Sequence, residues 1–139
     1  MYTIVKNFSL QEELTAMYEL LICTRDTIKK EVLVSRKAFE RACDIHIRNG
    51  FSSNQDFETA HQQHYLKFIE YDIYCHLVEI FSDYKDIYGQ FTAYQEMTST
   101  LKEWMFRCAE DENYEHAAVI KLWLDKLTGI IRHNGQLIH

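Results

Sequence analysis

Proline is absent from all 139 residues of this chain, and its absence constrains the fold more than any other feature of the sequence. A proline inside a helix removes a backbone hydrogen bond and clashes with the preceding turn, so it commonly ends the helix. The chain also has only four glycines, and 47% of its residues are hydrophobic. This composition predicts long uninterrupted helices packed as one all-α domain over residues 1–139, a helical bundle.

The first predicted helix starts with a capping box. In the pattern from Ser9 to Glu12, the hydroxyl accepts a hydrogen bond from one N–H of the first turn, and the carboxylate accepts another. Apolar residues then recur three, four or seven positions apart: Leu10, Leu14, Met17, Leu21, Ile28, Val32, Phe39, Cys43 and Ile47. Asn49 and Gly50 are typical of a helix C-terminus, so this helix should end there.

A second predicted helix follows after a very short loop. Ser53 and Asp56 repeat the capping pattern. The apolar stripe of this helix is Leu66, Ile69, Ile73, Leu77, Ile80, Tyr84 and Ile87. The same spacing continues past Gly89 to Phe91 and Tyr94. Because a short connection forces neighbouring helices to run antiparallel, residues 1–98 are predicted to form a long αα-hairpin.

Two shorter helices are predicted in residues 99–130. Thr100 and Glu103 form a capping box that predicts a helix start at Leu101. Asn113 is a good N-cap for the next helix, and Gly129 suits the position just after its end. The acidic segment Glu110-Asp111-Glu112 lies between the two helices. The sequence therefore predicts a short helical hairpin after the long one.

A compact set of residues surrounds this acidic turn: Ala109, Tyr114, Glu115, Ala117, Ala118 and Leu127. With this pattern, residues 101–128 resemble the UVR motif, which occurs in UvrB, UvrC and some Clp-type ATPases and their adaptors. The family usually has Arg-Asp where this chain has Lys121-Leu122. The UVR motif is a helical hairpin that docks protein partners and has no catalytic groups. The resemblance therefore implies a protein-binding or adaptor module.

If the short hairpin docks a partner, a few aromatic side chains near its turn should supply most of the binding energy. Tyr114 is the first candidate, followed by Trp104 and Trp123. The rim of the contact should consist of the turn acids Glu110, Asp111 and Glu112. Rim charges affect the association rate more than the final affinity.

Charge is distributed unevenly along the chain. Seven basic residues and four acids lie between Arg25 and Arg48, whereas residues 51–100 contain eight acids and two lysines. In one interpretation, antiparallel helices present complementary rims on either side of a shared core. In the other, basic residues near helical spacing form a docking strip for an acidic protein or a phosphate backbone: Lys30, Lys37, Arg41 and Arg48. The net charge of −6 favours a protein partner over nucleic acid.

Two groups of residues are candidates for binding metal. Cys43 and His46 lie near the end of the first predicted helix, and His61 and His64 lie near the start of the second. Such pairs on facing helices can close a tetrahedral zinc site, although Cys43 also suits a core and the histidines a partly exposed surface. The second group is Glu58, His61, Asp72, His76 and Glu79. It lacks the second Glu-x-x-His helix of a di-iron site, which favours a solvated helix face.

Other function classes have little support in the sequence. The chain has no glycine-rich phosphate loop, no G-x-S-x-G and no H-E-x-x-H, so we expect no enzyme. Widely spaced cysteines, the absence of an export leader and the lack of a membrane-length apolar run predict a cytoplasmic protein. A protein-docking adaptor is the leading hypothesis, and a homodimer is compatible with it. The alternatives are a metal-binding helical bundle and an acidic inhibitor of a nucleic-acid-binding enzyme.

Overall fold

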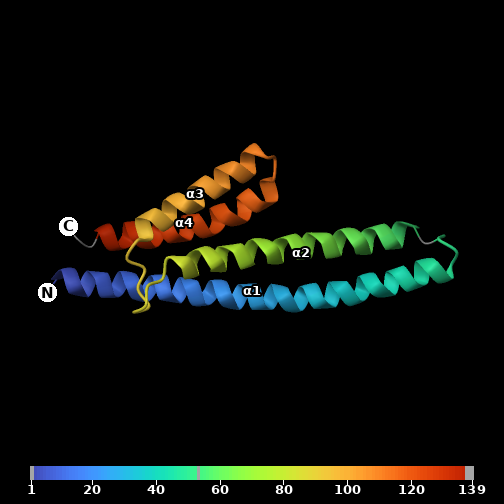
Figure 1. The fold of residues 1–139 in the computed structure, drawn as a ribbon, viewed down its shortest axis with the longest axis horizontal. Helices are drawn as coiled ribbons and strands as arrows, with labels where there is room; N and C mark the ends of the chain where they lie inside the picture. The colour runs from blue at the N-terminus through green and yellow to red at the C-terminus, as the bar shows by residue number, and fades with distance from the viewer. Residues whose placement is uncertain (1, 53, 137–139) are drawn as a thin grey trace. The chain divides into compact units, whose positions relative to one another are not determined.

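The computed structural model describes residues 2–52 and 54–136, with side chains described for residues 8–52 and 54–135. These residues form helices and no strand, which confirms the predicted all-α helical bundle (Figure 1). The helices are α1 (Tyr2–Arg48), α2 (Asn54–Asp83), α3 (Tyr94–Glu110) and α4 (Tyr114–Gln136). None of the described helices is both long enough and apolar enough to cross a membrane.

The structure divides into two compact units. The terminal unit contains Met1–Ile22 and His76–His139, and the hairpin unit contains Cys23–Cys75. The boundary between them therefore lies inside α1 and α2, whereas the sequence suggested a division between residues 98 and 99. Each unit is described by itself below.

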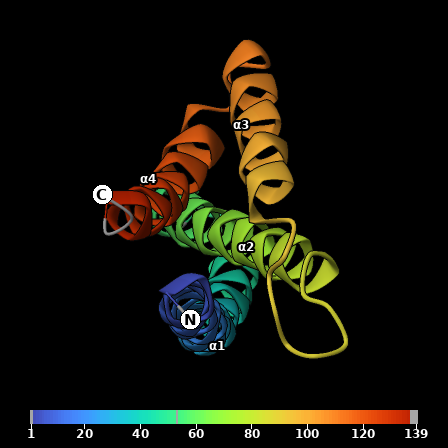
Figure 2. The same ribbon diagram turned by 90° about the vertical axis from the view of Figure 1, so that its left-hand side faces the viewer.

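The terminal unit contains most of the buried apolar side chains of the described chain. They come from the first part of α1, the end of α2, and α3 and α4. The largest of them are fully buried: Leu14, Leu21, Leu77, Phe81, Phe91, Met97, Leu101, Ile120, Trp123 and Leu127. Figure 2 shows α3 and α4 side by side, joined at one end by a short turn. These two helices place the predicted docking residues.

The segment between α2 and α3 is not helical, so the apolar spacing that continues past Gly89 does not belong to the second helix. A carboxylate oxygen of Asp86 accepts hydrogen bonds from the backbone N–H groups of Tyr88, at 2.9 Å, and Gln90, at 2.8 Å. Side-chain acceptors of this kind compete with the helical hydrogen bonds of the backbone. Helix α2 has already ended at Asp83, and Gly89, with a φ of 76°, also lies outside the helical conformation. Phe91 is nevertheless buried, as a residue of an apolar helix stripe would be.

Two predicted helix starts are wrong. Helix α1 begins at Tyr2 and includes Ser9, and α3 begins at Tyr94 and includes Thr100. The Thr100 hydroxyl forms a 2.6 Å hydrogen bond with the Tyr84 hydroxyl instead of capping a helix. A Ser or Thr followed by Glu three positions later also fits a helix interior, so this pattern alone does not set a start. The Ser53 cap lies outside the described residues.

The predicted end of the first helix is confirmed. Helix α1 ends at Arg48, and Gly50 follows with a φ of 60°. The N–H of Phe51 donates to the carbonyl of His46 over 2.8 Å, as in a helix C-cap with a left-handed residue. Helix α4, in contrast, continues through Gly129 to Gln136, so the predicted stop at Gly129 is wrong. An exposed glycine costs a helix only about 1 kcal/mol, and packing of the flanking turns offsets this.

The hairpin unit has a much smaller core. The second part of α1 and the first part of α2 run side by side in opposite directions within it (Figure 1). Only Ile28, Ile73 and Tyr74 are buried among its described hydrophobic residues. Large apolar side chains remain exposed on both helices and at the turn: Leu33, Val34, Ile45, Ile47, Phe51, Tyr65, Leu66 and Phe68. Two helices alone offer too little covering surface to bury both apolar faces.

Candidate functional site

The acidic turn of the α3–α4 hairpin is held by backbone hydrogen bonds. The N–H of Asn113 donates to the carbonyl of Cys108 over 2.8 Å, and the N–H of Glu112 donates to Ala109 over 3.1 Å. These bonds satisfy carbonyls at the end of α3, as in a Schellman cap. Glu112 has a φ of 62°, a conformation that glycine usually adopts. The predicted break between the two helices is therefore present, and its three acids lie on the surface.

Two aromatic side chains near this turn are exposed. Tyr114 is 66% exposed at the first position of α4, and Phe106 is 59% exposed in the last turns of α3. Tyr114 is one of the predicted anchors, whereas Phe106 was not predicted. Phe106 could have been found, because it lies out of phase with the buried stripe residues Leu101 and Cys108. We name the turn surface as Phe106, Glu110, Asp111, Glu112 and Tyr114.

The two tryptophans take different positions. Trp123 is only 2% exposed, and the Lys126 ammonium nitrogen lies 4.6 Å from the centroid of its ring. It belongs to the core, so we remove it from the predicted docking set. Trp104 is half-buried, and its ring stacks on His76 with a centroid separation of 4.2 Å. Trp104 on α3 therefore packs against His76 of α2, and it offers only part of its surface to a partner.

A buried thiol lies beneath the turn surface. Cys108 is buried near the end of α3, and this burial raises the pKa of its thiol above the ordinary value, with the Asp111 carboxylate adding a smaller effect in the same direction. Both effects disfavour the reactive thiolate. Cys108 is therefore a packing residue of the hairpin.

The predicted zinc ligands lie in an aromatic cluster. His46 stacks on Phe57 with ring centroids 4.8 Å apart, and His61 and His64 both pack against Phe39, at 5.4 Å and 5.7 Å. The Nδ1 atom of His64 is also 2.9 Å from the Ser35 hydroxyl, with which it shares a hydrogen bond.

Over residues 2–52 and 54–136, no three His, Cys, Asp or Glu side chains are grouped to hold a metal ion. Neither the set of Cys43, His46, His61 and His64 nor the set containing Glu58 and His76 is brought together as a metal site.

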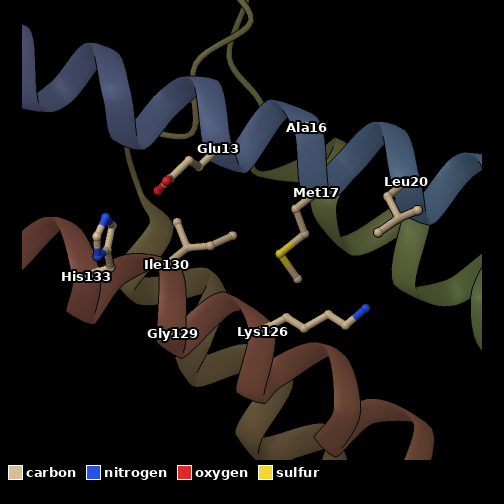
Figure 3. A pocket seen from close by; sticks show the side chains of 8 residues that line it. All are labelled: Glu13, Ala16, Met17, Leu20, Lys126, Gly129, Ile130 and His133. Atoms are coloured by element: carbon tan, nitrogen blue, oxygen red, sulfur yellow. The ribbon is translucent and has the colours of Figure 1, made fainter.

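The terminal unit has an open groove that the sequence analysis did not identify. It lies between α1 and α4 and has a volume of about 530 Å³. Met17 and Ile130 project between the helices, Glu13 and His133 lie toward one end, and Lys126 extends at the other (Figure 3). Its residues come from opposite ends of the chain, so no local pattern could reveal it. The lining combines apolar side chains with the charged residues Glu13 and Lys126.

Ion pairs in the hairpin unit do not follow the complementary-rim interpretation. The one pair between its described helices joins Lys67 to Glu31, with 2.7 Å between nitrogen and oxygen. This lysine lies on the acidic helix and this glutamate on the basic one, the reverse of the expected pairing. The hydrogen bond with Glu31 is the main cause that raises the pKa of Lys67 above its ordinary value.

The basic strip has no such partner. No ion pair within the described chain involves Lys30, Lys37 or Arg41. The charges of this strip are therefore left for water or for a second molecule.

Comparisons of this chain with models of protein families, with curated proteins and with solved structures find no match.

Proposed function

We propose that the protein is a binding or adaptor module that docks a protein partner through the turn surface of its α3–α4 hairpin. The observation that carries this proposal is the exposure of two aromatic side chains, Phe106 and Tyr114, on either side of an acidic turn. Aromatic residues with such exposure are favoured anchors at interfaces because they combine a large apolar area with few rotatable bonds. The likeness of residues 101–128 to the UVR motif supports the same role.

The chemistry of the turn surface indicates the kind of partner. Glu110, Asp111 and Glu112 are exposed and have no ion pair with another described residue. A protein with an apolar pocket bordered by basic residues would complement both the aromatic anchors and these carboxylates. A phosphate backbone would be repelled by the same acids, so we propose a protein partner and not nucleic acid.

One alternative uses the same surface. All of the formal net charge of −6 lies outside the hairpin unit, because residues 23–75 contain eight basic and eight acidic residues. An acidic inhibitor of a nucleic-acid-binding enzyme would present such a charge to a basic cleft. The two proposals differ in the partner: an inhibitor's affinity should fall steeply with salt, whereas aromatic anchoring should depend on salt only weakly.

The test begins with cross-linking of the full-length protein in its native cell and identification of the bound protein. Binding to that purified partner is then measured for the variants Tyr114→Ala and Phe106→Ala. Each should weaken binding at least about tenfold, because loss of a central aromatic anchor commonly costs 2 kcal/mol or more. The melting temperature should change by only a few degrees, because both side chains are largely exposed.

Tyr88 provides a matched control. Its side chain is also exposed, but it lies in the segment between α2 and α3 and not on the hairpin. Tyr88→Ala should leave the affinity unchanged. Two results together would refute the proposal. The Tyr114 and Phe106 variants would bind normally, and charge reversal at Lys30, Lys37 and Arg41 would abolish binding. The docking site would then lie on α1.

A further inference from the structure

The hairpin unit has an apolar groove along one side of its two helices. The groove has a volume of about 700 Å³, and Val34 and Ala38 from α1 and Leu66 from α2 contribute apolar groups to it. Val34 is 68% exposed and Leu66 is 41% exposed, although Leu77, on the same stripe of α2, is fully buried in the terminal unit. An apolar stripe that is buried in one unit and open in the other indicates that the open part has a further cover.

Charged residues from both helices border this groove: Lys30 and Glu31 from α1, and Lys67 and Glu70 from α2. Lys67 forms ion pairs with Glu31 and Glu70 within the chain. The basic strip continues along α1 from Lys30 to Lys37 and Arg41, and none of the three forms an ion pair within the described chain. Within the hairpin unit, α1 has seven basic residues and four acids, whereas α2 has four acids and one lysine. The hairpin unit therefore has a net basic segment of α1 next to a net acidic segment of α2.

The charges of these two helix segments complement those of a second copy in one symmetric arrangement. When two copies pack face to face, the twofold axis lies in the plane between them, either along the helices or across them. An axis across the helices would place α1 over α1 and α2 over α2, so that like charges meet. An axis along the helices places α1 of each copy over α2 of the other, so that basic residues meet acidic ones. Rotation about an axis along the helices does not change the position of a residue along that axis. Lys30 and Glu70 line the same groove, so Lys30 of one copy lies opposite Glu70 of the other.

We infer that a second copy of this chain covers the groove, and that the two hairpin units form a four-helix bundle with a twofold axis along the helices. Val34 of one copy lies against Leu66 of the other, and the basic strip of each α1 borders the acidic α2 of its neighbour. This contact uses a different surface from the turn of the α3–α4 hairpin.

The first experiment measures the molar mass of the full-length protein by sedimentation over a range of concentrations. The wild type should reach twice the chain mass of 16.6 kDa. Val34→Glu should remain a monomer with an unchanged far-ultraviolet circular dichroism spectrum, because this exposed position tolerates a polar side chain in the single chain. Leu122→Glu, at an exposed apolar position of α4, should dimerise like the wild type. A wild type that stays monomeric, or a Val34 variant that dimerises normally, would overturn the inference.

The second experiment tests the direction of the axis by charge reversal. Lys30→Glu and Glu70→Lys should each weaken dimerisation about tenfold, and the double variant should recover most of the loss, because the reversed charges again face each other between copies. Helicity measured on each variant at low concentration shows that the single chain still folds. A double variant that dimerises no better than either single variant would exclude the arrangement of α1 over α2. Binding of the identified partner by Val34→Glu, which should be normal, separates this inference from the proposed docking function.

Discussion

The residues that follow α1 and α3 both adopt a left-handed backbone conformation, but only one of the two helices uses glycine for it. After α1, the left-handed position is occupied by Gly50, with a φ of 60°, and Phe51 follows with a φ of 65°. After α3, Glu112 adopts a φ of 62° although it has a Cβ atom. A non-glycine residue in this region costs roughly 1–2 kcal/mol, which is tolerated when the surrounding structure holds it in place.

This strain leads to a prediction about stability. Glu112→Gly should stabilise the protein by about 0.5–1 kcal/mol, because the relief of left-handed strain exceeds the added entropy of the unfolded chain. Thermal unfolding should show a melting temperature higher by a few degrees. Glu112→Ala is the matched control: it removes the same carboxylate but keeps the Cβ atom, and it should give no such gain. A glycine variant less stable than the alanine variant would show that the turn is not strained.

At the scale of elements, the side chain of Gln11 attaches the non-helical segment between α2 and α3 to α1. The Gln11 amide nitrogen donates to the carbonyl of Phe91 over 3.2 Å, and its carbonyl accepts from the N–H of Phe91 over 2.6 Å. Gln11 thus satisfies both backbone groups of a buried residue. Phe91 in turn packs edge-on against Tyr18 and Phe81, with centroid separations of 5.9 Å and 6.2 Å. The segment that leads into α3 is therefore attached to α1.

Gln11→Ala should accordingly destabilise the protein by roughly 2–3 kcal/mol, because two buried backbone groups lose their partners. Chemical denaturation is the appropriate measurement. Gln95→Ala, which removes an exposed glutamine on α3, should change the unfolding free energy by less than about 0.5 kcal/mol. If both variants were equally stable, Gln11 would not be fixing this segment.

At the scale of the whole molecule, the two units differ in how much apolar surface they bury. Most fully buried side chains lie in the terminal unit, whereas the hairpin unit buries few and exposes many. Regions of a protein with few buried contacts open at a lower free energy than regions with many. The hairpin unit should therefore be the less stable part of a single chain.

Hydrogen exchange tests this difference. In dilute protein, the amides of residues 23–75 should exchange faster than those in the helices of residues 94–136. Raising the protein concentration should slow exchange in the hairpin unit selectively, because a second copy that covers the groove stabilises it by mass action. The Val34→Glu variant should lose this dependence on concentration. Equal protection of both units in dilute protein would contradict the difference in stability.

The sequence by itself determined the features that depend on neighbours along the chain. Lack of proline and helical spacing of apolar residues predicted the all-α class, because helix hydrogen bonds join residues only four positions apart. The end of α1 at Gly50 and the break at the acidic turn were also predictable, since turn and cap chemistry is local. The exposure of Tyr114 followed from its place at the start of α4 beside that turn.

Tertiary structure decided the features that depend on residues far apart in sequence. Thr100 binds Tyr84 instead of capping a helix, Gln11 binds the backbone of the non-helical residue Phe91, and Trp123 enters the core instead of the surface. The histidines near Cys43 pack against phenyl rings instead of facing a metal. The two grooves likewise exist only where separate helices meet. Periodicity shows which face of a helix is apolar, but which partner covers that face, or leaves it open, is set by the packing of all the helices together.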